Sequence, residues 1–386
     1  MALGLDEAQP DALIIGGGLA GATLGVMLAH AGRTVTLVEK CSTMHHKVCG
    51  EFLSREAVVY LEQLGLDLGS LGAVPIHGVR LAARSLIAES ALPFVAMSLT
   101  RRVLDEALLS RAAQAGAHVL RGDRVESLTR SVSGWTARLS GGGSVCGSTA
   151  FLATGKHDVQ GRPRLVTKQS ELVAFKMYFR LEPLQNSALA DHAELVMFPG
   201  GYAGLQPVEG GITNLCLLVT RAQLRRCDGR WAALLDYIQT SSGFLAKRLQ
   251  GALPQLSKPL ALSSIPYGLL RPHAEDSLWR LGDQAAVIPS FSGDGMSIAL
   301  HSANLAASLY LSGHTADFFQ HRLYKELHNS INLAAMLSRL MIVAPVLAQT
   351  ARFWPSLLSD IASRTRIPFE ALLTNQSGVT RPSLRV

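Results

Sequence analysis

The sequence predicts an α/β fold in which one domain opens with a strand, a glycine turn, a helix and a second strand, a further domain is built on a β-sheet, and the C-terminal part is helical. Three observations lead to this prediction: the pattern of residues 12–38, four strand-like runs between residues 171 and 220, and the helical composition of residues 315–366. The 386 residues are 48% hydrophobic and 17% charged, which excludes a disordered chain and suffices for two or three domains.

The N-terminal unit carries the most specific motif. Residues 12–38 read as an apolar strand, a helix and a β-branched strand, with Gly16, Gly18 and Gly21 in a G-x-G-x-x-G turn and Glu39 after the second strand. In such a turn the first glycine permits a tight bend, the second lets the backbone approach a pyrophosphate, and the third lets the helix pack on the strand. The helix N-terminus attracts phosphates, and an acid at this position binds a ribose, so the unit predicts dinucleotide binding.

The remaining elements are predicted from periodicity and from glycine, serine and proline punctuation. Helices are expected at residues 55–64, 100–116, 229–250 and 295–311. Short strands are expected at residues 124–128, 135–139, 144–152 and 278–282. The strands of the second domain are expected at residues 171–181, 194–198, 202–208 and 211–220.

Three later segments decide which dinucleotide is expected. Residues 151–155 (FLATG) end a strand in an Ala-Thr-Gly turn, Arg101 precedes Asp105 by four residues, and residues 278–300 run from a strand through Asp283 into a helix. With the glycine turn, this set resembles the flavoprotein superfamily of para-hydroxybenzoate hydroxylase and geranylgeranyl reductase, over about residues 10–310. The resemblance implies a Rossmann-like FAD-binding domain, a β-sheet substrate domain and a helical C-terminal part. It divides the chain into an FAD-binding domain (1–165 and 263–312), a substrate domain (166–262) and a C-terminal part (313–386).

The resemblance also implies which residues bind FAD. Arg101 would reach the pyrophosphate side, Asp283 the ribityl chain, and the N-terminus of the helix that follows would favour negative charge on the reduced flavin. The expected cofactor-binding residues are Gly16, Gly18, Gly21, Glu39, Lys40, Cys49, Gly50, Arg101, Thr154, Gly155, Asp283, Gly293, Gly295 and Met296. NAD(P)H is expected as a transient reductant without a Rossmann domain of its own, because the sequence shows one such fingerprint.

Residues 45–51 (HHKVCGE) form the second distinctive stretch. They resemble the Cys-Gly element of geranylgeranyl reductases and of the hydroxylases associated with type III polyketide synthases. Cys49 and Gly50 are expected to line the flavin, and His46, Lys47 and Cys49 are the candidate catalytic residues, although the flavin itself would carry the chemistry. An equally open interpretation is a loop whose glycine makes room for the ring. We expect no covalent bond to the flavin.

The substrate is expected to lie against the second sheet. The candidate substrate-contacting residues are Phe175, Met197, Phe198 and Tyr202, with burial in the sheet core as the alternative for each. Halogenases of this superfamily carry a W-x-W-x-I-P motif, which is absent here, so halogenation is disfavoured. The region lacks the tryptophan of the Tyr-x-Trp-x-Phe-Pro element of geranylgeranyl reductases, which counts against a reductase.

We therefore expect an FAD-dependent monooxygenase that uses NAD(P)H and O₂ to hydroxylate an aromatic or polyketide-like, hydrophobic substrate. The alternative is a flavin-dependent reductase that saturates double bonds of a prenyl or polyketide chain. A halogenase and a non-catalytic flavoprotein are further alternatives. No metal site is expected, because no His/Cys/Asp cluster has ligand spacing.

The net charge of +7 lies wholly in residues 221–386, which hold 17 basic and 10 acidic side chains. No dense basic cluster points to nucleic acid. The stretch 333–347 is apolar, and Arg339, Arg352, Arg364 and Arg366 lie in or near it, which suggests core packing or a face that meets a lipid surface or an acidic, substrate-bearing carrier. Five cysteines without a C-x-x-C pair favour a cytoplasmic protein, with peripheral membrane contact left open. The sequence does not indicate the oligomeric state.

Overall fold

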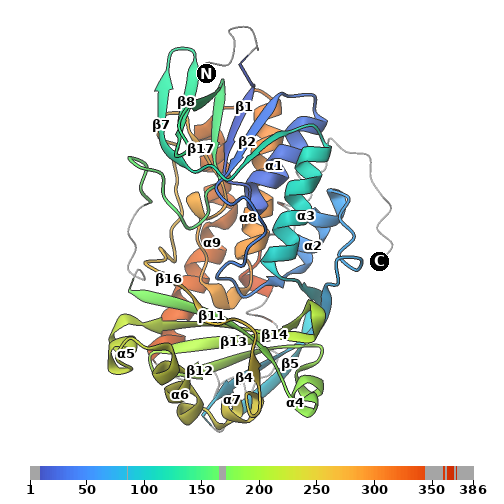
Figure 1. Cartoon of the computed structure of the whole chain (residues 1–386), viewed down its shortest axis with the longest axis vertical. Coiled ribbons are helices and arrows are strands. Elements are labelled where there is room, and N and C mark those ends of the chain that lie inside the picture. The colour runs from blue at the N-terminus through green and yellow to red at the C-terminus, as the bar shows by residue number, and fades with distance from the viewer. Residues whose placement is uncertain are drawn as a thin grey trace.

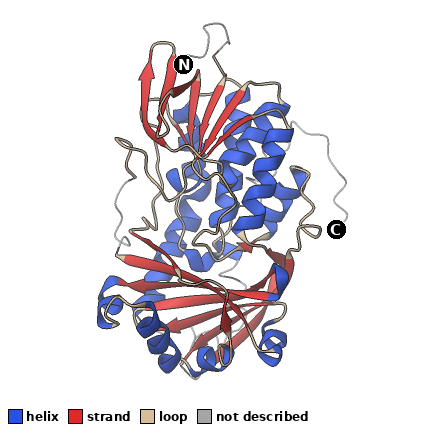
Figure 2. Cartoon of the chain, viewed as in Figure 1, coloured by secondary structure: helices blue, strands red, loops and turns tan. Residues whose placement is uncertain are grey.

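The computed structural model describes residues 9–84, 86–164, 171–343, 360, 363–368 and 371. Two bodies are stacked along the long axis of the molecule, and helices α8 (Gly295–Leu311) and α9 (Ala316–Val343) run from the upper body toward the lower one (Figure 1). The upper body is a parallel sheet with helices, and the lower body is a large sheet with short helices beneath it (Figure 2). The predicted α/β fold class is confirmed.

The upper body contains five parallel strands in the order β17-β10-β1-β2-β6. Their bounds are β1 Ala12–Ile15, β2 Val35–Glu39, β6 His118–Arg121, β10 Thr149–Leu152 and β17 Trp279–Arg280. Helices α1 (Leu19–His30), α3 (Arg101–Gln114) and α8 cover one face. A three-stranded sheet covers the other face, with β7 at Val125–Ser131, β8 at Gly134–Leu139 and β9 at Ser144–Gly147. Because all five strands are parallel, their carboxyl ends meet at one edge, which is where ligands bind in such sheets.

The lower body is a nine-stranded sheet in the order β15-β11-β14-β13-β12-β4-β5-β3, with β16 also paired to β11. Its strands are β3 Phe52–Leu53, β4 Val74–Ala83, β5 Leu86–Ser98, β11 Leu172–Arg180, β12 His192–Phe198, β13 Gly201–Val208, β14 Ile212–Thr220, β15 Leu253–Pro254 and β16 Leu260–Ser263. One face packs on helices α5 (Arg221–Arg226), α6 (Trp231–Ser241) and α7 (Gly243–Arg248), with α4 (Pro183–Leu189) at the sheet margin. The other face is turned to the upper body, with α2 (Arg55–Gln63) near the β3 edge.

The hairpin β4–β5 corrects the predicted domain boundaries. The first part of the FAD-binding domain is predicted over residues 1–165, yet β4 pairs with β12 of the second sheet. The hairpin is rich in alanine and interrupted by Gly78 and Pro93, so its strand signal is weak, and cross-strand pairing supplies what its own propensity lacks.

Two further predictions are corrected where serine interrupts an element. The helix predicted over residues 229–250 is two helices, because Ser242 is extended (φ −140°) and its hydroxyl accepts from Leu245 N–H at 3.3 Å, which begins α7. The strand predicted over residues 144–152 is split into β9 and β10, which belong to different sheets.

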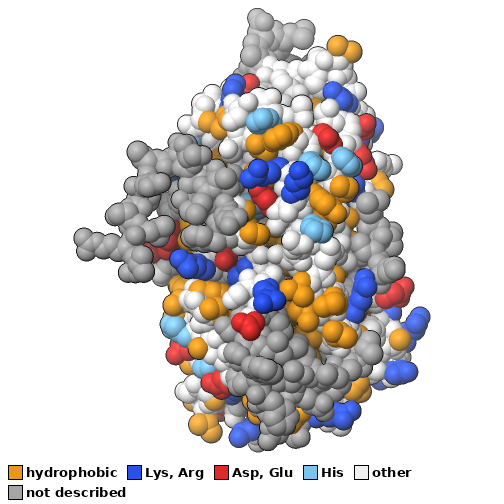
Figure 3. All heavy atoms as spheres, turned by 180° about the vertical axis from the view of Figure 1, so that it is seen from behind, with side chains coloured by type: hydrophobic (Ala, Val, Ile, Leu, Met, Phe, Trp, Pro, Cys, Tyr) orange, Lys and Arg blue, Asp and Glu red, His pale blue; other side chains and the backbone are white. Residues whose placement is uncertain are grey.

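The C-terminal part begins with α9, which is 28 residues long. Within the region predicted to be helical, residues 315–366, the segment 344–359 with Arg352 lies outside the described residues. Arg339 and Arg364 are exposed. Arg366 is buried in an ion pair and does not join an exposed basic face, which corrects that prediction. Figure 3 shows charges of both signs scattered over the back of the molecule rather than a basic stripe. In the described ranges, no helix is both long and apolar enough to cross a membrane.

Candidate functional site

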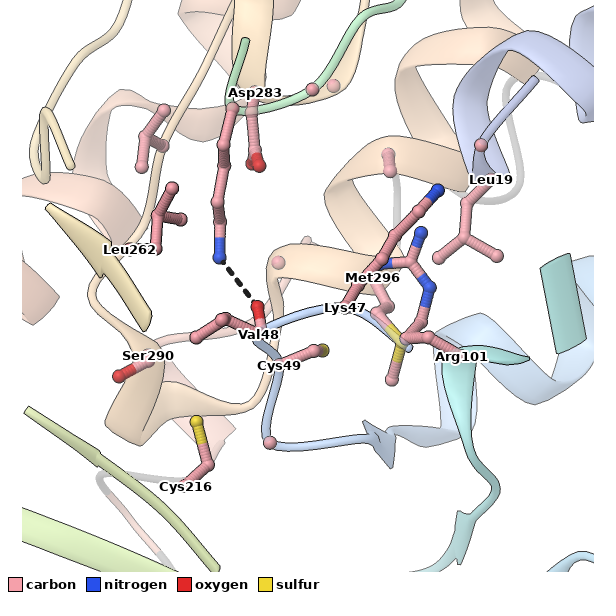
Figure 4. Close-up of a pocket in the computed structure, with 18 of the residues that line it drawn as sticks. Leu19, Lys47, Val48, Cys49, Arg101, Cys216, Leu262, Asp283, Ser290 and Met296 are labelled. Atoms are coloured by element: carbon pink, nitrogen blue, oxygen red, sulfur yellow. Dashed lines mark hydrogen bonds between the residues drawn. The ribbon is translucent and has the colours of Figure 1, made fainter. Parts of the chain in front are cut away.

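A cavity of about 760 Å³ lies between the two bodies. Its upper wall comes from the glycine turn, from the carboxyl ends of the parallel strands and from the N-terminus of α8. Its lower wall is the facing side of the nine-stranded sheet. Figure 4 shows Leu19, Arg101 and Met296 on one side of this cavity and Leu262, Ser290 and Cys216 on the other.

Each of the three positions of the turn requires glycine for a different physical reason. Gly16 has φ +103°, and a Cβ there would meet the Ala153 carbonyl oxygen at 2.5 Å. A Cβ on Gly21 would lie 1.9 Å from the Gly16 carbonyl oxygen, so both positions are closed by the protein itself. A Cβ on Gly18 would meet only Lys47 Nζ at 3.5 Å and Arg101 Nη2 at 3.7 Å, on the cavity side. Gly18 thus keeps open a cradle between the start of α1 and two cations.

Those two cations share one carboxylate. Arg101 binds Asp105 through Nε–Oδ1 at 2.7 Å and Nη2–Oδ2 at 3.0 Å, and Lys47 Nζ lies 2.7 Å from Oδ2. Burial alone would raise the pKa of Asp105, but Arg101 and Lys47 outweigh burial and hold this pKa below its usual value. Two cations and one anion leave net positive charge beside the N-terminus of α1, which suits a pyrophosphate.

Glu39 is held in place at the end of β2. Its Oε2 accepts the Gly17 N–H at 2.7 Å and its Oε1 accepts the Cys41 N–H at 2.9 Å. Lys40 follows it and also lines the cavity. Each carboxylate oxygen has further lone pairs, so this end of the cavity suits a ribose.

The other expected cofactor residues line the same cavity. Thr154 and Gly155 follow β10, and Asp283 lies in the 3₁₀ turn Gly282–Gln284 that follows β17. Gly293 has φ +76°, where a Cβ would strike the Phe52 ring at 2.6 Å, and α8 begins two residues later. The last of this set, Gly295 and Met296, open α8 and line the cavity. Thirteen of the fourteen expected FAD contacts therefore line this cavity, and the fourteenth, Gly21, packs inside the protein.

The loop of residues 45–51 crosses the cavity and is fixed by the lower sheet. Asn214 Nδ2 donates to the carbonyls of Cys49 (3.1 Å) and Gly50 (2.8 Å), and Lys156 Nζ donates to that of Val48 at 3.2 Å, the dashed line of Figure 4. Of the candidate catalytic residues, Lys47 is drawn toward Asp105 and Gly18, at the phosphate end.

His46 and Cys49 lie nearer the lower sheet. The His46 ring lies 4.9 Å from the ring of Tyr178, and burial followed by the charge of Lys176 lowers its pKa, so the imidazole is neutral at pH 7. Cys49 Sγ accepts the Glu51 N–H at 3.3 Å. All five cysteines of the chain are free thiols.

Glu51 anchors this loop through contacts that the sequence analysis missed. It is fully buried at φ +65°, and its Oε1 lies 2.5 Å from Lys176 Nζ and 2.8 Å from Tyr178 Oη, while Arg101 N–H donates to it at 2.8 Å. Burial raises the pKa of Glu51, and Lys176 opposes this rise. The available signal was Lys176 itself, a charged residue within the buried strand β11.

Two of the four expected substrate residues face away from the cavity. Phe175 packs on Trp231 (5.7 Å between ring centroids) and Phe198 on Tyr237 (6.4 Å), in the core beneath the sheet. Met197 is on the cavity side but buried among its neighbours. Tyr202 alone lines the cavity, with its hydroxyl 2.9 Å from Ser290 Oγ. Successive strand residues alternate faces, and in β11 both faces are buried, so hydrophobicity gave no sign of which face meets the cavity.

Comparisons with known proteins agree with this geometry. A family described as FAD binding domain matches residues 9–146. Menaquinone reductase of Mycolicibacterium smegmatis is 26% identical over 331 residues, which are 81% of this chain and 79% of that protein. The flavin-dependent brominase Bmp2 superposes with a TM-score of 0.77 at 16% identity, over 96% of this chain and 98% of that one. P. aeruginosa PqsL, in complex with 2-aminobenzoylacetate, superposes with a TM-score of 0.71 at 19% identity, over 90% of this chain and 100% of that one.

At these identities the solved structures establish the fold. The fold and the matched domain together define an FAD-dependent oxidoreductase, and the protein is an enzyme with FAD as its cofactor. The family match over residues 9–146, which contain the glycine turn, Glu39 and Arg101, and the shared fold support the resemblance drawn from the motifs.

Proposed function

We propose that the protein is an FAD-dependent monooxygenase that hydroxylates an apolar aromatic or polyketide-like substrate, with NAD(P)H as the reductant and O₂ as the oxygen donor. The observation that supports this best is that the cavity of about 760 Å³ joins the dinucleotide cradle to an apolar sheet face. A flavin held by the first would face a substrate held by the second.

The residues of the upper wall fit FAD. Gly18 leaves the cradle open beside two cations, Glu39 offers a carboxylate for the ribose and Asp283 one for the ribityl chain. When bound, the flavin supplies the two-electron chemistry and the activation of O₂. The chain itself would position the ring through the loop of residues 45–51 and through the N-terminus of α8, which favours negative charge by about 0.3–1 kcal/mol.

The lower wall and the loop segments beside it offer neutral hydrogen-bonding groups to a substrate. Tyr202 and Tyr267 are buried beside Ser290 and line the cavity. Burial raises the pKa of both phenols, so they stay protonated at pH 7. Neutral hydroxyls amid apolar side chains suit a carbonyl or hydroxyl oxygen on an otherwise apolar molecule.

The second candidate is a reductase that saturates a double bond or reduces a quinone. It is favoured by the match to menaquinone reductase, which spans four-fifths of this chain, whereas the missing tryptophan of the Tyr-x-Trp-x-Phe-Pro element, ahead of Phe198, counts against the geranylgeranyl type. Both candidates use the same cavity. They differ in what the reduced flavin would react with, which is O₂ in the monooxygenase and the substrate itself in the reductase.

The deciding experiment compares the two fates. The purified FAD-loaded protein is reduced with NADH or NADPH and mixed with candidate aromatic, polyketide and prenylated substrates, once with ¹⁸O₂ and once without oxygen. A product that gains one ¹⁸O atom supports the monooxygenase, and a product that gains two hydrogens under anaerobic conditions supports the reductase. Failure of both NADH and NADPH to reduce the bound flavin would overturn the proposal.

A further inference from the structure

The lower wall of the cavity is ordered in rows that run across the strands. Directly paired residues share a face, and the register places Cys216 of β14 opposite Gly204 of β13, Gly204 opposite Leu195 of β12, and Leu195 opposite Leu81 of β4. All four line the cavity. They form one row, here called the middle row.

The two rows beside it have other partners. On one side, Asn214 binds the loop of residues 45–51, and Gln206 donates to Ser98 Oγ at 2.7 Å. On the other side, Tyr202 and Met197 are buried in a cluster with Met341 of α9. The middle row lies between them, so the free space above it depends on how small the side chains of Gly204 and Cys216 are.

Gly204 is not required by the backbone. Its φ lies outside the left-handed region, and the nearest atom to a Cβ would be the Cys216 carbonyl oxygen at 3.7 Å, an ordinary contact. This differs from Gly201 in the same strand, where a Cβ would lie 2.1 Å from the Leu218 carbonyl oxygen. A glycine inside a strand weakens the strand and often marks a bulge, a bend, or a place where a ligand or another backbone approaches closely. What Gly204 supplies is space in the cavity.

Cys216 continues this space. Its side chain is partly open although Leu215 and Leu217 beside it are buried. Burial, partly offset by Lys176, raises the pKa of its thiol to about 12, so it is uncharged at pH 7. Figure 4 shows its sulfur pointing across the cavity toward Val48 and Cys49. The next residue of the row, Lys176, is turned to Glu51 and adds no free charge.

The row becomes more apolar toward β4. Leu195 and Leu81 follow Gly204, and Val79 and Leu92 line the cavity next to them. Neighbouring strands lie about 4.8 Å apart, so the path from β14 to β4 is about 14 Å long. The row thus combines a shallow, neutral end under the loop with an apolar extension.

We propose that Gly204 and Cys216 determine substrate specificity: they form the floor on which a flat, uncharged ring lies, and Leu195 and Leu81 take an apolar tail on that ring. This inference rests on the proposed function, because it assumes that the substrate lies between the flavin and the sheet. It limits the substrate to rings without charge and excludes bulky, branched head groups.

The test uses 2-methyl-1,4-naphthoquinone as a ring without a tail and the same ring with a phytyl tail as probes. Binding is measured from the change in flavin absorbance of the FAD-loaded protein and from quenching of tryptophan fluorescence. Gly204→Leu and Cys216→Leu should each weaken binding of both probes at least tenfold. Leu195→Gln should weaken only the tailed probe. FAD content and the melting temperature should stay close to those of the wild type.

Gly243→Leu is the matched control, because Gly243 is exposed on α7 and its Cβ would meet nothing within 4 Å. Unchanged affinity in Gly204→Leu and Cys216→Leu would overturn the inference. So would a wild type that binds FAD and accepts electrons from NAD(P)H but binds neither quinone, an outcome that leaves the proposed function standing. In a third outcome, tryptophan quenching shows that the wild type binds the quinones and that Gly204→Leu weakens this binding, but NAD(P)H does not reduce the flavin. This outcome would support the inference about Gly204 and Cys216 and reject the proposed function.

Discussion

Arg366 and Asp294 form a buried ion pair with 2.9 Å between Nη1 and Oδ1. Asp294 directly precedes α8, whose first turn lines the flavin cavity, and the Arg366 guanidinium also lies 4.2 Å from the centre of the Phe94 ring of β5. The pair therefore joins the C-terminal segment, the upper body and the second sheet at the cofactor site. Burial raises the pKa of Asp294 to about 7, although Arg366 opposes this rise.

This carboxyl group predicts a dependence of stability on pH. Its pKa is above the ordinary 3.8, so between about pH 4 and pH 7 the folded protein holds a proton that the unfolded chain has released. The stability from Asp294 is fully present below pH 4 and is lost as the pH rises through 7. Urea unfolding from pH 5 to pH 8 should show the wild type losing stability relative to Asp294→Asn.

The matched control is Asp236→Asn, at an exposed position on α6. The difference between wild type and Asp236→Asn should not vary with pH. A difference between wild type and Asp294→Asn that is equally flat would contradict the raised pKa.

Gly18→Val should yield a folded chain with little flavin. A side chain there meets only the ends of Lys47 and Arg101, so the protein tolerates it, but it fills the cradle beside the two cations. Absorbance at 450 nm and the melting temperature of the purified variant check the two halves of this prediction. Gly21→Ala should instead fail to fold, because its Cβ would lie 1.9 Å from the Gly16 carbonyl oxygen. A fully yellow Gly18→Val protein would show that the pyrophosphate lies elsewhere.

Cys49→Ala should retain FAD and lose part of the turnover. The Cys49 sulfur accepts the Glu51 N–H and lines the cavity, so we expect it to pack beside the flavin without bonding to it. Acid precipitation of the wild type should leave all flavin in the supernatant. Cys146→Ala is the matched control, since this thiol is exposed on β9 and does not line the cavity. Flavin that remains in the acid-precipitated pellet of the wild type, but is released from the pellet of Cys49→Ala, would show a covalent bond to Cys49 and refute the expectation.

The parts of the site that sequence reasoning could predict are local. Gly16, Gly18, Gly21 and Glu39 lie within one β-α-β unit, so spacing alone fixes their neighbourhood. The i,i+4 spacing of Arg101 and Asp105 on one helix works in the same way. In such motifs the spacing in the sequence alone determines which residues lie close together.

The parts that could not be predicted depend on pairing between distant segments. Glu51 meets Lys176, which is 125 residues away, only because β11 occupies a particular place in the sheet. Phe175, one residue earlier in that strand, therefore faces the opposite side. A strand buried on both faces hides this choice, because a shift of one residue exchanges the two faces without changing the hydrophobic pattern.

The Glu51–Lys176 pair gives the last prediction. Lys176→Met should lower the free energy of unfolding by about 3–5 kcal/mol, because it leaves a fully buried carboxylate without its cation. The pKa of Glu51, already raised by burial, should rise further, so the loss should shrink as the pH falls and this group protonates. Adding Glu51→Gln removes the uncompensated charge, and the double variant should recover much of the lost stability. Urea unfolding of the wild type, both single variants and the double variant measures this coupling.

Arg230→Met is the control, because Arg230 pairs with Asp228 on the surface, where ion pairs contribute little. Losses in the two single variants that simply add in the double variant would show that the pair does not act as a unit.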